Sequence, residues 1–246
     1  MIVRAPLCCI YVVLSSFFAA EAFAGPPFKT DDPQPVDYLH WEFYIASAQQ
    51  FERHETNATC PHFELNYGVV PNVQLHLVAP LGYVHSDDGT HYGYSDTEVG
   101  IKYRLVEETE TAPQIGIFPL VELPTGDKKK QLGSGKVQAY VPAWVQKSWG
   151  KLTTYAGGGF WYNPGVGQKN WLFSGWEAQY DFSEVVTLGG ELYYQTADSQ
   201  DSGSSGGFNF GGFINLNENN HILFSLGHSI SGRATITGYI GYQLTI

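Results

Sequence analysis

Charged side chains recur at alternate positions in segments whose other positions are apolar. Between Thr97 and Val106, the even positions include Glu98, Lys102 and Arg104, while valine, isoleucine, tyrosine and leucine fill odd positions. Successive side chains of an extended strand point to opposite faces, so these charges share one face. Charged groups on a shared face could line an aqueous path and sort solutes by charge and size.

The same alternation marks a larger set of interior candidates. On a lipid-facing surface, a midplane Arg or Lys costs about 2–4 kcal/mol, so the polar face is expected to point inward. The candidates are Glu42, Glu64, Gln74, His76, Glu98, Lys102, Arg104, Glu122, Gln146, Glu177, Gln179 and Glu191. We expect Lys102 and Arg104 to pair with glutamates of neighbouring strands, such as Glu98, Glu122 and Glu64. Two interpretations stay open: a narrow, net acidic path, or a hydrogen-bonded plug that fills the interior.

Such residues must be positioned by strands, and the alternation predicts twelve of them. An even-numbered, antiparallel transmembrane β-barrel is the fold class that needs apolar and polar faces on every strand. Pro80, Pro119 and Pro142 fall inside predicted strands, where we expect bulges or strand ends. The predicted strands are His40–Gln50, His62–Tyr67, Val73–Val84, Thr97–Val106, Gln114–Leu123, Val137–Lys147, Leu152–Tyr162, Trp171–Tyr180, Val185–Thr196, Phe208–Leu216, His221–Ser229 and Thr235–Ile246.

The connectors between these strands alternate in length. Long outer loops and short periplasmic turns are typical of outer-membrane barrels, so both termini are expected on the periplasmic side. The predicted outer loops are Phe51–Pro61, His85–Asp96, Pro124–Lys136, Asn163–Asn170, Ala197–Gly207 and the shorter Ile230–Ala234. The predicted turns are Gly68–Asn72, Glu107–Pro113, Ser148–Lys151, Asp181–Glu184 and Asn217–Asn220.

Aromatic residues gather near the predicted strand ends. Rings in this position are typical of the girdles at the two membrane interfaces, and the alternative is an ordinary sandwich core. The periplasmic girdle is predicted from Trp41, Tyr67, Trp149, Tyr180, Phe182 and Tyr242, and the outer girdle from Tyr83, Trp161, Trp171, Tyr194 and Phe208.

The N-terminal region divides into two predicted segments before the barrel of residues 40–246. Residues 1–24 resemble a signal peptide, with Arg4, an apolar stretch and a small-residue cleavage site ending at Ala24. Residues 25–39 form a Pro-rich leader, which is either a disordered periplasmic tail or a segment folded into the barrel mouth as a plug. After cleavage Cys60 is the remaining cysteine, so no intrachain disulfide is expected.

Composition and motifs argue against several other classes. The net charge of −11 disfavours nucleic acid as a partner. The run from Gly133 to Lys136 lacks the first glycine of a phosphate-binding loop and is followed by Val137, so we interpret it as a turn. No serine, histidine and acid are spaced as a catalytic triad requires, so no enzyme, cofactor or metal is predicted. A lipid-modifying enzyme is kept as the third alternative.

Five segments resemble one family of proteobacterial outer-membrane proteins. They are GPPFKTDDPQPVDYLHWEFY at 25–44, QLHLVAPLGY at 74–83, DTEVGIKYRLVEET at 96–109, PQIGIFPLVELPTGD at 113–127 and GYIGYQLTI at 238–246. The family is labelled as phenol-degradation meta-pathway proteins or as transporters. The resemblance implies an outer-membrane β-barrel that passes hydrophobic or aromatic compounds, and it implies no catalytic residues.

Together these observations predict a channel in the cell outer membrane that passes small solutes. The expected partners are outer-membrane lipid and lipopolysaccharide, a small-molecule solute and the barrel-assembly machinery during biogenesis. The main alternative is a closed structural or surface-interaction barrel that acts through its outer loops.

Overall fold

The computed structural model describes residues 26–87 and 89–246, so the predicted signal peptide lies outside the described residues. These residues form a sheet of fourteen strand segments. In chain order, the segments are β1 (Trp41–Phe51), β2 (Glu55–Val70), β3 (Val73–Ser86), β4 (Gly89–Tyr94), β5 (Thr97–Val106), β6 (Gln114–Ile117), β7 (Leu120–Leu123), β8 (Gln138–Trp149), β9 (Leu152–Tyr162), β10 (Trp171–Asp181), β11 (Val186–Gln195), β12 (Ser205–Asn217), β13 (Asn220–Ser231) and β14 (Ile236–Thr245). In the described part of the chain, no helix is long and apolar enough to cross a membrane.

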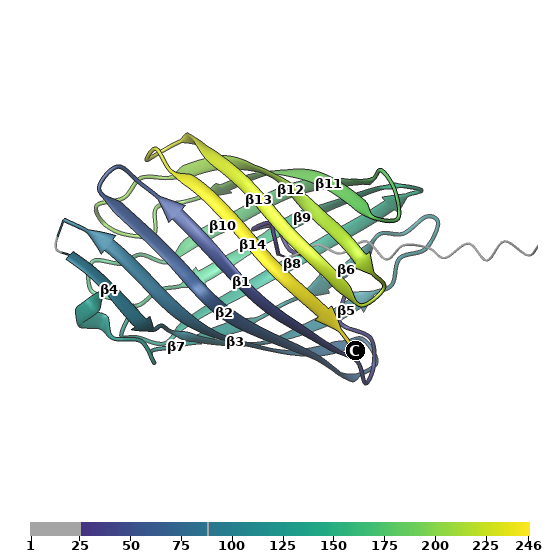
Figure 1. Ribbon diagram of the computed structural model, residues 1–246, viewed down its shortest axis with the longest axis horizontal. Coiled ribbons are helices and arrows are strands. Elements are labelled where there is room, and N and C mark those ends of the chain that lie inside the picture. Colours follow the sequence, from purple (N-terminus) through teal and green to yellow (C-terminus); the bar gives the residue numbers. More distant parts are fainter. Residues whose placement is uncertain (1–25, 88) are drawn as a thin grey trace, which may run out of the picture.

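The sheet closes on itself as an antiparallel barrel (Figure 1). β1 pairs with both β2 and β14, so the first and last strands of the sheet are neighbours. On the far side, β3 pairs with β4 and then β5, and β8 pairs with β6 and β7. Because β4 continues into β5 and β6 into β7, the fourteen described segments make twelve strands. The predicted antiparallel barrel of twelve strands is therefore confirmed.

The interruptions in the wall lie where the sequence has prolines. Pro119 separates β6 from β7, and Pro142 lies opposite this break, where β8 changes partner from β6 to β7. Pro80 pairs with His62, beside a register shift in β2. A proline lacks the N–H that a central strand donates, so breaks and bulges at these points remove the conflict.

Two predicted outer loops are wrong in extent. β2 begins at Glu55, so residues 52–54 alone connect it to β1, and β4 occupies half of the predicted loop His85–Asp96. The hairpins continue beyond the segments that alternate apolar and polar residues. Backbone pairing can continue in water whatever the side chains, so hydropathy alternation does not mark where such a strand ends.

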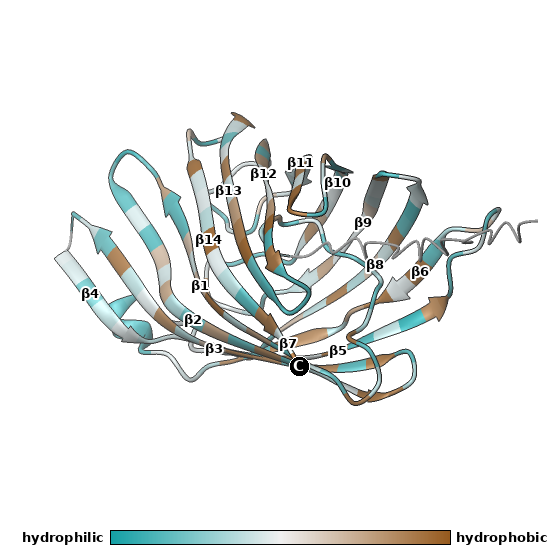
Figure 2. Cartoon of the chain, turned by 45° about the vertical axis from the view of Figure 1, so that its right-hand side comes forward, coloured by the Kyte–Doolittle hydropathy of each residue, from teal (hydrophilic) through white to brown (hydrophobic). Residues whose placement is uncertain are grey.

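Hydrophobic and hydrophilic residues alternate along the strands (Figure 2), and the exposed face of the wall carries the apolar side chains while polar side chains are buried inside. Exposed side chains on the outer face include Ile45, Leu77, Ile101, Val145, Leu172, Trp176, Leu192, Phe210, Leu226 and Ile240. A continuous exposed apolar band of this kind is what a lipid-facing barrel requires.

Two rings assigned to the outer girdle are placed differently. Trp161 and Trp171 turn inward and pack against a buried aromatic cluster, so this part of the prediction is wrong. Trp171 and Glu177 both occupy odd-numbered positions of β10, and Glu177 was predicted to face inward. The same alternation therefore places the Trp171 ring inside the barrel.

Candidate functional site

The Pro-rich leader, residues 26–39, crosses the barrel interior. Side chains of the barrel wall accept hydrogen bonds from its backbone N–H groups. The Glu191 carboxylate accepts the N–H groups of Lys29 and Thr30, at 2.9 and 2.8 Å. Farther along, the Val36 N–H donates to the side-chain oxygen of Gln74 at 2.9 Å. A proline-rich segment has few N–H donors of its own, and these contacts pair three of them with side chains of the wall.

Three inward-facing glycines leave room for the leader. A Cβ atom at Gly175 would lie 2.1 Å from the Thr30 Oγ1 atom, and one at Gly116 would lie 2.9 Å from the Pro33 side chain. At Gly68, the same atom would lie 1.9 Å from the Asp37 carbonyl oxygen. The leader therefore packs closely against the barrel wall at β2, β6 and β10.

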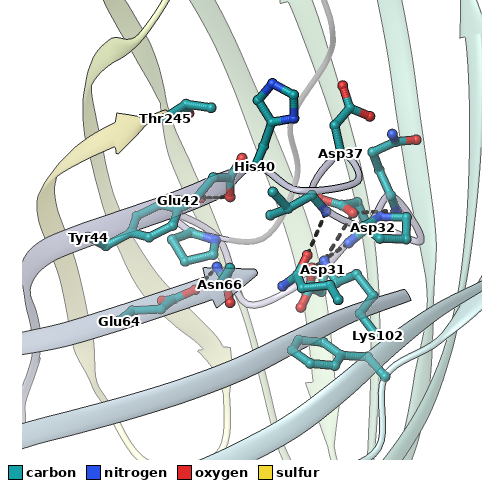
Figure 3. Close-up of a pocket in the computed structure, with 16 residues that line it drawn as sticks. Asp31, Asp32, Asp37, His40, Glu42, Tyr44, Glu64, Asn66, Lys102 and Thr245 are labelled. Atoms are coloured by element: carbon teal, nitrogen blue, oxygen red, sulfur yellow. Dashed lines mark hydrogen bonds and ion pairs between the residues drawn. The ribbon is translucent and has the colours of Figure 1, made fainter. Parts of the chain in front are cut away.

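A buried ion-pair cluster holds the middle of the leader to β5. The Lys102 Nζ atom lies 3.0 Å from the Asp31 Oδ1 atom and 3.1 Å from the Asp32 Oδ1 atom (Figure 3). Arg104 donates to the side-chain oxygens of Gln34 and Asn72, each at 2.8 Å. The prediction that Lys102 pairs with glutamates of neighbouring strands is wrong, because Asp31 and Asp32 of the leader are its partners. It is also wrong for Arg104, whose ion pair is with Glu107, three positions along the chain, at 3.6 Å.

Asp32 is the acid of this cluster whose pKa is shifted. Burial raises the pKa of its carboxyl from 3.8 to about 6, and the neighbouring Lys102 ammonium opposes that shift. Loss of hydration disfavours the charged form of a carboxyl more than one adjacent cation compensates here. Asp32 therefore titrates close to neutral pH.

A small cavity of about 90 Å³ lies between the leader and the inner faces of β1 and β2. Figure 3 shows Glu42, Tyr44, Glu64 and Asn66 facing the leader across it. The Tyr44 hydroxyl donates to Glu42 at 2.9 Å, and the Asn66 amide donates to Glu64 at 2.9 Å. This end of the interior is thus lined by hydrogen-bonded acids.

The remaining predicted interior residues also lie on the inner face. His76 is buried and contacts Glu98, with 2.9 Å between Nε2 and Oε1. Glu122 pairs in register with Glu98 on the adjacent strand. Glu177 and Glu191 are buried, as are Gln74, Gln146 and Gln179. Within the described residues, no group of three or more His, Cys, Asp or Glu side chains is arranged to hold a metal ion.

Two larger cavities lie on the other side of the leader, toward the long loops. One has a volume of about 490 Å³ and is lined by Phe28, Leu132 and Tyr239 among others. The second, of about 460 Å³, is lined by Trp171, Tyr193 and residues of the loops after β11 and β13. Lys29 of the leader borders both. The interior thus widens on one side of the leader and narrows on the other.

An aromatic wall runs along β8 to β11 inside the barrel, and the sequence analysis missed it. Trp161 stacks on Tyr140 with 4.7 Å between ring centroids, and on Trp171 with 5.3 Å. Phe173 and Tyr193 continue the wall toward Lys29, whose ammonium lies 4.2 Å from the Tyr193 ring centroid. Phe173 and Tyr193 have the same parity as Glu177 and Glu191 on their own strands, and that parity is the signal that places these rings inside.

A closed antiparallel barrel with an apolar outer face and a polar interior is the architecture of outer-membrane β-barrel proteins. The chain belongs to the family described as "Putative MetA-pathway of phenol degradation", whose model matches residues 50–245. This confirms the resemblance found in the sequence motifs. No match was found among curated proteins.

Solved structures with a similar fold include an outer-membrane channel and porins. An outer membrane channel from Pseudomonas putida F1 has a TM-score of 0.70 at 16% identity, over 87% of this chain and 98% of that one. The NanC porin has a TM-score of 0.59 at 6% identity, and the KdgM porin, in complex with disordered oligogalacturonate, has 0.56 at 11%. Each porin match covers 82% of this chain and 98% of the porin. These matches establish the shared barrel fold.

Proposed function

We propose that this protein is an outer-membrane channel for small solutes, narrowed by its own leader. The observation that carries the proposal is the pair of cavities of about 490 and 460 Å³ on one side of the leader, against cavities of about 90 and 190 Å³ on the other. A wide entrance followed by a constriction lets a pore select by size and charge. The exposed apolar band supports placement of the barrel in lipid.

The loop lengths favour one orientation of the barrel. Long loops are typical of the outer side and short turns of the periplasmic side, so the two large cavities would face outward and both termini the periplasm. The proposal includes export by a signal peptide cleaved near Ala24, insertion by the barrel-assembly machinery, and contact with outer-membrane lipid and lipopolysaccharide. It includes no catalytic role.

The charge of the constriction favours some solutes over others. Asp31 and Asp32 together outweigh the single Lys102 ammonium, and Glu42 and Glu64 lie across the small cavity. Ionised carboxylates repel anions, so the narrow part is expected to admit neutral or cationic solutes more readily at neutral pH.

Aromatic compounds are the solute class that we propose. The wall of Tyr140, Trp161, Trp171, Phe173 and Tyr193 offers stacking contacts along the widened half of the interior. The description of the family, which names phenol degradation, agrees with this choice.

Swelling of liposomes tests this proposal directly. Vesicles containing the refolded mature protein should swell in solutions of small neutral solutes, and more slowly as solute size increases. An absence of swelling, with barrel folding established by heat-modifiable gel mobility, would contradict the channel. It would favour the closed barrel that acts through its outer loops.

A further inference from the structure

Lys29 is the charged residue that lines the cavity of about 490 Å³. The cavity of about 490 Å³ is lined otherwise by neutral residues, with Lys29 of the leader on its border toward the second cavity. The neutral lining combines rings and an aliphatic side chain, from Phe28, Tyr239 and Leu132, with amides such as Gln49 and Asn57. A site with one cation and a mostly apolar lining has the composition of a small-molecule pocket.

The Lys29 ammonium forms no close ion pair within the described residues. In the part of the chain that the structure describes, no carboxylate oxygen lies within 4.0 Å of its Nζ atom, and its close contact is the Tyr193 ring at 4.2 Å. The Glu191 carboxylate is near, but its two oxygens accept hydrogen bonds from the Lys29 and Thr30 backbone and from the Asn209 amide.

Desolvation makes an anion favourable at this position. The surrounding protein lowers the pKa of Lys29, and Glu191 opposes that shift. A cation that has lost part of its hydration gains more from an anionic partner than a fully hydrated one does. The Lys29 N–H donates to Glu191, and the ammonium lies over the Tyr193 ring, at the border of the two cavities.

We propose that this cavity binds a small organic monoanion with a carboxylate on an aromatic body, the carboxylate pairing with Lys29. The ring would lie against Phe28, Tyr239 and Leu132, on the side of Lys29 that faces away from the second cavity. The second cavity is lined by the carboxylates of Glu52, Asp198 and Asp201, which would repel the anion. This inference rests on the proposed function and names one solute class for its wide half. The acidic constriction beyond then acts as a barrier to the bound anion, so such solutes cross slowly or only when protonated.

Binding of benzoate to the purified full-length mature barrel in a neutral detergent tests the proposal by titration calorimetry. Benzamide has the same shape without the charge, and acetate has the charge without the ring. Benzoate should bind about tenfold or more tightly than either, the size of effect expected for one charge-assisted contact. Equal binding of benzoate and benzamide, or of benzoate and acetate, would overturn it.

Variants of Lys29 test whether the preference for benzoate depends on this residue. Lys29→Gln should reduce benzoate affinity to that of benzamide, whereas Lys29→Arg should retain the preference. Lys151→Gln, in an exposed turn at the opposite end, is the matched control and should bind as the unmodified protein does. A benzoate preference that survives Lys29→Gln would exclude this site.

Conductance of the same samples separates this inference from the proposed function. A barrel that conducts potassium chloride but does not prefer benzoate would refute the anion site and leave the channel in place. A barrel that prefers benzoate but is silent in a bilayer would support the site and contradict the channel.

Discussion

At the scale of single residues, Lys102 is the side chain on which the leader most depends. It is 5% exposed and bridges two leader carboxylates, of which Asp32 is also buried. Breaking a buried ion pair by removing one partner typically costs about 3–5 kcal/mol, because a buried charge is left uncompensated. Lys102→Gln should therefore loosen the leader, and bilayer recordings should show higher conductance and a stronger preference for cations.

The exposed Lys151→Gln variant removes a charge of the same sign without touching the leader. Its conductance and selectivity should match those of the unmodified protein. If Lys102→Gln behaved like Lys151→Gln, the ion-pair cluster would have no part in conduction.

Asp32 makes the constriction sensitive to pH. Its folded pKa of about 6 lies above the ordinary value of 3.8, so the docked leader binds a proton that the undocked leader lacks between these values. Docking is therefore favoured in acid, and this contribution is lost as the pH rises through about 6. At pH about 5 the neutral Asp32 should weaken the cation preference seen at pH about 7, measured as a shift in reversal potential.

The variant Asp32→Asn separates this titration from that of other groups. Its selectivity should change less between the two pH values than that of the unmodified protein. An undiminished change would assign the pH dependence to different residues.

Residue placement was predictable where it depends on parity alone. The inward positions of Glu64, Lys102 and Glu191 follow from alternation along their own strands. The partners of Lys102 were not predictable, because Asp31 and Asp32 are about seventy positions away in the sequence and leave no local pattern.

At the scale of elements, the leader and its glycine seat act together. Gly175→Ala would place a Cβ atom 2.1 Å from the Thr30 Oγ1 atom, which forces the leader or β10 to move. We expect a lower midpoint of thermal unfolding and a higher conductance. The matched control is Gly203→Ala, because a Cβ atom there would meet nothing within 4 Å.

A second substitution makes this prediction specific. Thr30→Ala removes the hydroxyl that the new methyl group would meet. The double variant Gly175→Ala, Thr30→Ala should therefore be more stable than Gly175→Ala alone, and its conductance should fall back toward that of the unmodified protein. Failure of Thr30→Ala to compensate would show that Gly175→Ala acts on the wall itself rather than through the leader.

The loop Pro124–Lys136 is a second inward element, and Asp96 anchors it. The Asp96 carboxylate accepts the N–H of Gly126 at 2.9 Å and that of Ser134 at 2.7 Å, while Leu132 of the loop is buried. Hydrogen bonds to a charged group contribute about 1.5–3 kcal/mol each at most, so Asp96→Ala should free the loop. Proteolysis within residues 124–136 should become faster, with little change in barrel folding; equal rates would contradict the anchor.

Elements were predicted well where the strand crosses the apolar band and poorly beyond it. Strand β5 has the bounds that alternation gave, Thr97–Val106. The extension of β2 back to Glu55 was missed, because its first residues carry polar side chains on both faces. Hydropathy reports the surroundings of a strand, and outside the membrane both faces meet water.

At the scale of the whole molecule, the closed barrel and the leader docked inside it differ in how far the sequence predicts them. The twelve-stranded wall, traced through the described residues, could be predicted because every strand repeats the same signal. The leader could not, since a proline-rich segment has the same composition whether it is free or docked. The glycines that receive it lie in three distant strands, and their common role is visible only once the barrel has closed.

The most direct test is the single-channel conductance of the refolded mature protein beside a variant lacking residues 26–36. Both proteins should fold as heat-modifiable barrels, because the wall is paired from β1 to β14 without the leader. We predict small, discrete, cation-preferring steps for the complete protein and clearly larger steps for the shortened one. Equal conductance in the two proteins, or silence in both, would contradict the claim that this barrel is a channel narrowed by its own leader.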